Sequence, residues 1–220
     1  MSQLADRILL WGRARIAPWA ACCVLLVSGV CWASGGGEAV VANPIGGSGC
    51  SGLRDAVVLV IRHAEKPEAG RELTARGQQR AQAYADYFKN LTIDAKTLRP
   101  DYLVAAADSS GSERPRLTLE PLSKALGLNL DLRFKPKNPE ELAEELRSKP
   151  HGKCILVCWH HGKIPDLVQA LGADPPKLLP DGKWPDQEFA WILMLRYDSE
   201  GRLIPGQTKR LDGLRLASGP

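Results

Sequence analysis

The chain has 220 residues, of which 44% are hydrophobic and 25% are charged, and these fractions predict a folded domain with a packed core. Its net charge is +4, and no run of Lys and Arg interleaved with aromatic residues occurs in it. Composition therefore gives no reason to expect a nucleic acid partner.

The first 33 residues have the pattern of a targeting segment. Residues 1–15 carry three arginines, 16–32 are almost entirely apolar, and Ala33 and Ser34 follow. This order is typical of a secretory signal peptide, with cleavage after Ala33. The alternative is an uncleaved membrane anchor, since about 17 apolar residues is the lower limit for spanning a bilayer. We expect a periplasmic or secreted protein, or a domain tethered outside the cytoplasm by residues 16–32.

Residues 34–52 are rich in Gly and Ser, which predicts a flexible linker before a folded domain at 53–220. Cys154 and Cys158 of this domain fall on one predicted strand, about 13 Å apart along it, which is too far for a disulfide. We expect both to be small buried hydrophobic residues. The cysteines have no metal-binding spacing, so no metal site is expected.

Beyond the linker, short apolar runs alternate with segments of helical periodicity. We expect strands at 56–61, 101–106, 130–134 and 154–159, helices at 78–89, 115–126, 139–149 and 165–171, and a final strand pair at 189–197 and 202–211. Thr74 and Asn138 are predicted to cap helices, and Gly127 to end one. Strands that alternate with helices predict an α/β fold, here a three-layer α/β/α sandwich with a mainly parallel central sheet.

Polar side chains follow three of the predicted strands. Arg62 and His63 come after the first, Arg114 lies in the loop after the second, and His160 and His161 follow the strand at 154–159. Ligands bind at the carboxyl ends of such strands, so we expect these side chains to meet at one edge of the sheet. Two guanidinium groups suit a phosphate dianion, and a neutral imidazole can attack phosphorus.

Four segments resemble landmarks of one family, the histidine phosphatase superfamily, also called phosphoglycerate mutase-like. They are similar to its motifs in the family's own order, at 60–67 (with Ala64 in place of the usual Gly), 73–77, 110–122 and 157–162. The resemblance runs from about residue 56 to residue 171 and implies the same fold as the strand and helix pattern.

The resemblance implies that His63 is a nucleophile that becomes phosphohistidine, and that Arg62 and Arg114 bind the phosphoryl oxygens. A second histidine would stabilise the transferring group, water would hydrolyse the intermediate, and no metal or cofactor would be needed. The family's commonest spacing before Ile164 indicates His160 as this second histidine. The His-Gly pair indicates His161, which we prefer slightly while keeping both.

The proton donor is not assigned by this pattern. Many family members place an acidic residue in an insertion after the second arginine, but here the segment 130–139 is short, offers the lysines Lys135 and Lys137, and carries its one acid, Asp131, within a predicted strand. Glu65, Asp186 and Glu188 are weak candidates for the donor. Lys66 is a candidate cation at the rim of the site.

The leading prediction is a metal-independent phosphatase that hydrolyses a phosphomonoester through phosphohistidine, outside the cytoplasm. Its substrate would be a small phosphorylated molecule or a phosphoprotein, and the sequence does not name it or the oligomeric state. A non-catalytic phospho-ligand binding protein of the same fold is the alternative. A third reading is a membrane-tethered envelope protein whose partner matters more than its chemistry.

Overall fold

A computed structural model of the protein describes residues 52–216. The predicted signal peptide or anchor at 1–33 and the linker up to residue 51 lie outside the described residues. Within the described part of the chain, no helix has the length and apolar character needed to cross a bilayer.

The core of the domain is a six-stranded sheet in the order β5-β4-β6-β1-β7-β8. The first four of these strands are mutually parallel. Strand β7 runs antiparallel to β1, and β8 runs antiparallel to β7. Their bounds are β1 Val57–Arg62, β4 Tyr102–Ala105, β5 Leu130–Asp131, β6 Cys154–Trp159, β7 Trp191–Arg196 and β8 Lys209–Asp212. A separate small hairpin is formed by β2 Thr92–Ile93 and β3 Lys96–Thr97.

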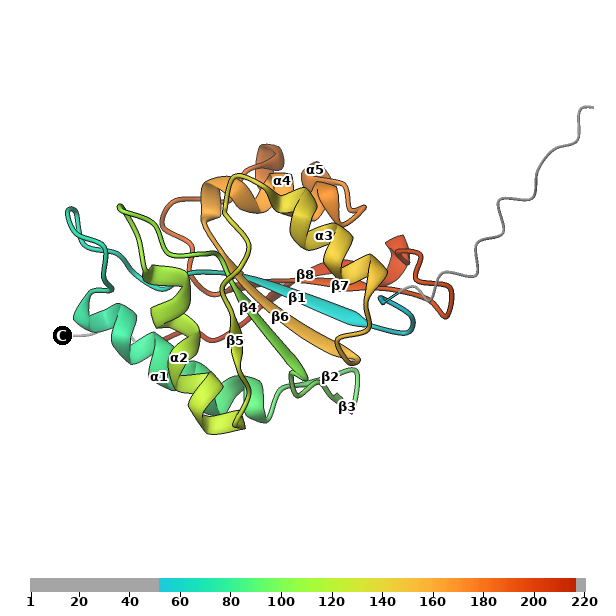
Figure 1. The fold of residues 1–220 in the computed structure, drawn as a ribbon, viewed down its shortest axis with the longest axis horizontal. Helices are drawn as coiled ribbons and strands as arrows, with labels where there is room; N and C mark the ends of the chain where they lie inside the picture. The colour runs from blue at the N-terminus through green and yellow to red at the C-terminus, as the bar shows by residue number, and fades with distance from the viewer. Residues whose placement is uncertain (1–51, 217–220) are drawn as a thin grey trace, which may run out of the picture. The chain divides into compact units, whose positions relative to one another are not determined.

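Helices cover both faces of the sheet (Figure 1). One face carries α1 Ala75–Lys89 and α2 Arg114–Leu126, and the other carries α3 Pro139–Ser148, α4 Ile164–Ala170 and α5 Pro175–Leu178. Two large hydrophobic clusters, one on each side of the sheet, fill the space between these layers. The predicted three-layer α/β/α sandwich with a mainly parallel sheet is confirmed.

The two central strands are buried along their whole length, as their solid apolar sequences predict. Side chains alternate between the faces of a strand. In β1, Leu59 and Ile61 pack with α1 and α2, whereas Val58 and Val60 pack with α3 and α4. The same alternation in β6 puts Cys158 on the α1/α2 face, and it decides which groups meet beyond the strand ends.

Local signals set most helix ends. The Thr74 hydroxyl accepts a hydrogen bond from the Gly77 amide at 3.0 Å, and Gly127 ends α2 with a φ of 67°. Asn138 is the N-cap residue of α3 and Pro139 is its first helical residue, as predicted, but the Asn138 side chain donates to the Glu141 carboxylate and makes no capping bond to the backbone. Cys154 and Cys158 are buried free thiols, as expected.

Two predicted strands are shorter than expected. The strand expected at 130–134 pairs with β4 only over Leu130–Asp131, opposite Leu103 and Val104, and beyond it the Phe134 carbonyl accepts a single hydrogen bond from the Ala107 amide. The last strand, expected at 202–211, spans only Lys209–Asp212, after a 3₁₀-helix at Pro205–Gln207. Neither change affects the edge of the sheet where the histidines lie.

Candidate active site

The parallel pairing of β1 with β6 brings two histidines together. Arg62 is the register partner of Trp159, so His63 and His160 each come one residue past the end of the paired strands. The His63 amide donates to the Trp159 carbonyl at 3.1 Å, and the two imidazole centroids are 5.3 Å apart. His161 begins a 3₁₀-helix, η1 (His161–Lys163), and its ring centroid lies 6.3 Å from that of His63.

His63 is held in one tautomer. Its side chain is buried, and Nδ1 lies 2.7 Å from the Ala64 carbonyl oxygen. Because a carbonyl oxygen only accepts, Nδ1 carries the hydrogen and Nε2 keeps its lone pair. Burial lowers the pKa of His63 to about 3, and the nearby charges of His160, Arg62 and Arg114 lower it further. His63 is therefore neutral at physiological pH.

The loop after β1 is tied to α2. The Ala64 amide donates to the Thr118 hydroxyl at 2.9 Å, and this hydroxyl donates to the Arg114 carbonyl at 2.7 Å. The carbonyl that orients His63 is thus fixed by the helix that also supplies Arg114. The Arg114 guanidinium donates through Nη2 to the Gly70 carbonyl at 2.7 Å, which holds it against the same loop.

Arg62 is buried at the end of β1, and the segment that leads into β7 holds its side chain. Its Nη1 group donates to the carbonyls of Pro185, Asp186 and Glu188, and its guanidinium carbon lies 3.9 Å from the centre of the Phe189 ring. Burial lowers the pKa of Arg62 to about 10, so it remains charged at neutral pH. The segment 185–189 is therefore part of the site, although no local pattern in the sequence marks Phe189.

His160 is favoured over His161 as the partner of His63. The backbone of His160 is extended, so the alternation that puts Cys158 on the α1/α2 face puts His160 there too, with Arg114. Burial lowers the pKa of His160 to about 4, and Arg114 is the nearest charge that adds to this shift. His160 and Arg114 therefore share one face of the sheet.

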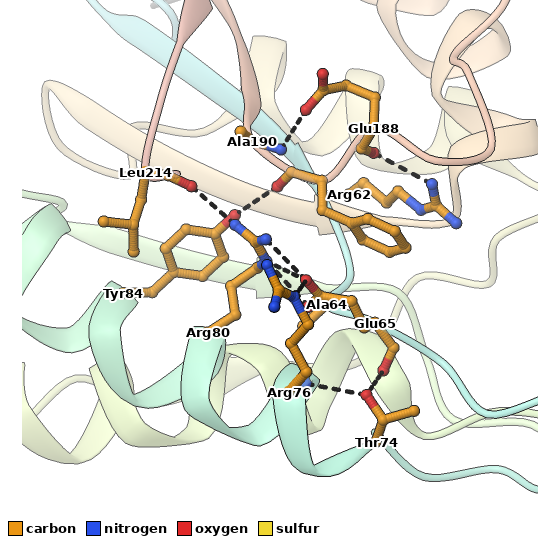
Figure 2. A network of polar contacts seen from close by, with 12 residues as sticks. Arg62, Ala64, Glu65, Thr74, Arg76, Arg80, Tyr84, Glu188, Ala190 and Leu214 are labelled. Carbon is orange, nitrogen blue, oxygen red and sulfur yellow. Dashed lines mark hydrogen bonds and ion pairs between the residues drawn. The ribbon is translucent and has the colours of Figure 1, made fainter. Parts of the chain in front are cut away.

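Glu65 does not face the histidines. Its carboxylate accepts from Nε of Arg80 with both oxygens at 3.0 Å and from Nη2 of Arg80 at 2.7 Å, and it lies 3.5 Å from Arg76. Figure 2 shows these side chains together. Arg80 also donates to the Leu214 carbonyl at 2.8 Å, so the pair joins α1 to the segment after β8. The Glu65 carboxylate is therefore occupied by this ion pair.

The other predicted rim residues gather around a small cavity. Lys66 lines a cavity of about 350 Å³ together with Arg62, His161, Asp186, Gln187 and Phe189. The Glu188 carboxylate points elsewhere, because it accepts from the Ala190 amide at 2.6 Å. A larger groove of about 920 Å³ lies between α1 and α2 and includes none of the histidines or Arg62. Among residues 52–216, no group of His, Cys, Asp and Glu is arranged to hold a metal ion.

No protein family model matches the chain, and no curated protein matches it. Several solved structures do match it. One is the protein histidine phosphatase SixA complexed with tungstate, with 18% identity over 67% of this chain and 92% of that chain and a TM-score of 0.42. Another is a putative phosphohistidine phosphatase SixA from Agrobacterium tumefaciens, with 18% identity over 68% and 96% and a TM-score of 0.44.

A third is a mycobacterial glucosyl-3-phosphoglycerate phosphatase, with 14% identity over 72% of this chain and 99% of that chain and a TM-score of 0.46. These neighbours are of the superfamily that the sequence motifs resemble. Their likeness to this chain is low in identity and in superposition, so the proposal below rests on the geometry of the site.

Replacing Arg80 with Met should lower the free energy of unfolding by about 3–5 kcal/mol, because it leaves the Glu65 carboxylate buried without its partner. The side chains of Glu65 and Arg80 are only 13% and 6% exposed. Equilibrium urea unfolding measures the change. Arg76→Met is the matched control, since Arg76 is 44% exposed and should contribute less than about 1 kcal/mol. Equal losses in the two variants would contradict this account of the pair.

Lowering the pH from 7 to 4 should reduce the free energy of unfolding. The folded pKa values of His63 and His160, about 3 and about 4, lie below the ordinary value of 6.5. The unfolded chain therefore takes up protons that the folded chain does not, so this contribution is full above pH 6.5 and is lost as the pH falls toward 4. Urea unfolding at a series of pH values measures the slope.

Carboxylates also make the free energy of unfolding depend on pH in this range. The contribution of the two histidines is therefore measured by comparing variants with the wild type. A His63→Asn/His160→Asn double variant should show a shallower slope than the wild type. The control is His151→Asn, whose ring stacks on Tyr102 at the other end of the sheet. An unchanged slope in the double variant would show that the two histidines are not held neutral by the fold.

Proposed function

We propose that the protein is a phosphatase that hydrolyses a phosphomonoester through a phosphohistidine formed on His63. The observation that carries the proposal is the buried, neutral His63, whose Nδ1 hydrogen is committed to the Ala64 carbonyl. Its Nε2 lone pair is therefore available at neutral pH, close to the cations Arg62 and Arg114, whose charges act on its pKa. A nucleophile beside two guanidinium groups is the arrangement that phosphoryl transfer requires.

The two arginines have donors to spare for a phosphoryl group. Each uses a single terminal nitrogen on backbone carbonyls, Nη1 in Arg62 and Nη2 in Arg114. Both Nε atoms are buried and have no hydrogen-bond partner within residues 52–216. A buried donor without an acceptor is costly, by about 1–3 kcal/mol, and the oxygens of a phosphate dianion would satisfy these donors.

In this proposal His160 is the second catalytic histidine. Its ring lies next to that of His63, on the side of the sheet from which Arg114 enters. From there it can donate a hydrogen bond to an equatorial phosphoryl oxygen, where negative charge accumulates as the group is transferred. Action outside the cytoplasm is a further part of the proposal, supported by the signal-like pattern of residues 1–33 alone.

The purified domain should hydrolyse p-nitrophenyl phosphate, and His63→Ala should reduce the activity to background because the nucleophile is lost. His160→Gln should reduce kcat by about 10²–10³-fold, the usual effect of removing one group that stabilises developing charge. The measurement is the release of p-nitrophenol, with His151→Gln as a control that keeps full activity.

The non-catalytic alternative makes the opposite prediction. A folded wild-type protein that binds inorganic phosphate, measured by calorimetry, but shows no turnover between pH 4 and 8 would be a phospho-ligand binding protein. Activity that survives in His63→Ala would contradict the assigned nucleophile.

A further inference from the structure

His161 and Asp186 form an ion pair at the edge of the site that the two-histidine mechanism does not use. The Nε2 atom of His161 lies 2.9 Å from Oδ1 of Asp186. The histidine comes from η1, directly after β6, and the aspartate from the segment that leads into β7. Asp186 is 82% exposed and His161 is 25% exposed, so the pair reaches from the solvent into the site.

The orientation of the His161 ring leaves its Nδ1 atom available for proton transfer. Because the Asp186 carboxylate accepts at Nε2, that nitrogen carries a hydrogen. The Nδ1 atom is buried and has no hydrogen-bond partner in the described part of the chain. The ring centroid lies 6.3 Å from that of His63, near enough for a transferring phosphoryl group and its leaving oxygen to lie between them.

The charges around His161 come from several elements. Arg62 at the end of β1 and Lys66 in the following loop lower the pKa of His161, in addition to burial, and Asp186 raises it. His160 lies beside it and is itself affected by the His161 charge. Burial is the largest cause, so the pKa of His161 stays below its ordinary value, and Asp186 is the group that acts against this shift by favouring the protonated ring.

Two of the three carboxylates that were candidates for the proton donor are engaged away from the histidines. Glu65 is paired with Arg80, and Glu188 accepts from the Ala190 amide. His161 is therefore the candidate in the described site that combines a position next to His63 with an unpaired nitrogen.

The cavity beside this pair suits a small polar group. It has a volume of about 350 Å³. Its one apolar lining side chain is Phe189, and the polar ones are those of Arg62, Lys66, His161, Asp186 and Gln187. Phe189 is itself covered by the Arg62 guanidinium. A hydrophilic alcohol would find hydrogen-bond partners here, whereas a long apolar chain would leave these polar groups unsatisfied.

We propose that His161 donates the proton to the leaving alcohol, that Asp186 positions it, and that the cavity holds the alcohol of a small hydrophilic phosphomonoester. The assignment rests on the proposed phosphohistidine mechanism. It gives the site a proton donor without an acidic insertion after Arg114.

The proton and electron pairs balance over two steps. In the first, the Nε2 lone pair of His63 forms a bond to phosphorus, the bond from phosphorus to the ester oxygen breaks, and that oxygen takes the proton from Nδ1 of His161. In the second, a water oxygen bonds to phosphorus while the P–N bond breaks and its electron pair returns to His63. The proton of the water goes to Nδ1 of His161, which restores the starting state.

The test compares esters whose leaving groups differ in their need for a proton. In His161→Gln, kcat/KM for glycerol 2-phosphate should fall by about 10²–10⁴-fold, because an alkoxide cannot leave unprotonated, whereas kcat/KM for p-nitrophenyl phosphate should fall by less than about tenfold. The ratio kcat/KM reports the steps up to P–O cleavage, so hydrolysis of the intermediate does not affect it.

Variants of Asp186 provide an independent arm, since this side chain is exposed and its replacement leaves the core intact. Asp186→Asn should show the same selective loss on the alkyl ester, smaller than that of His161→Gln, and Asp186→Glu should restore much of the activity. The matched control is Asp166→Asn. This exposed aspartate lies on α4 and is paired with Lys163, and its replacement should leave kcat/KM for both substrates unchanged.

Equal losses on both esters in His161→Gln and Asp186→Asn would overturn the inference, because they would show a role in binding phosphate or in holding the segment 185–189. That result would leave the proposed function standing. A wild-type protein inactive on p-nitrophenyl phosphate, or an active His63→Ala variant, would instead overturn the proposed function, and this inference with it.

Discussion

The site depends on the parallel register of β1 against β6. With Arg62 opposite Trp159, the chain leaves both strands at the same level, and the next residues, His63 and His160, come into contact. A shift of one residue in this register would turn one of the histidines to the opposite face. The apolar runs of the two strands fix the register, because every side chain of both strands is buried against one helical layer or the other. Packing of the core therefore sets how His63 and His160 lie relative to each other.

Burying Arg62 and His63 would be unfavourable without specific compensation, and each is compensated differently. His63 avoids the desolvation of a charge by remaining neutral, with its Nδ1 hydrogen given to the Ala64 carbonyl. Arg62 keeps its charge and receives three carbonyl groups and the face of Phe189 from the segment before β7. The buried Arg62 thus donates hydrogen bonds to a segment more than 120 residues away in sequence, and that segment also carries Asp186. The same interactions shape the cavity and hold the His161–Asp186 pair in place.

Much of this arrangement could be predicted from the sequence. The apolar runs predicted the buried strands, and the positions of Arg62, His63 and Arg114 after strands predicted that they meet. The choice between His160 and His161 could not be made from spacing, since both follow the strand, and our proposal of His160 uses the alternation of side chains in β6, which only the folded chain shows. The part played by Glu65 was hidden because its partner, Arg80, lies on a helix whose apolar stripe does not mark it as buried. Phe189 and Asp186 carry no local signal, because only tertiary contacts bring them to Arg62 and His161.

In the proposed mechanism the fold prepares one nitrogen of one histidine, Nε2 of His63, for attack on phosphorus. The most direct measurement is the position of the phosphoryl group in the intermediate. The wild-type protein can be quenched in base during turnover of p-nitrophenyl phosphate, since the P–N bond is stable there, and the phosphorylated peptide analysed by tandem mass spectrometry and by NMR against phosphohistidine standards. The account predicts a phosphoryl group on His63, attached through Nε2. A phosphoryl group on Nδ1, or on any other residue, would contradict it.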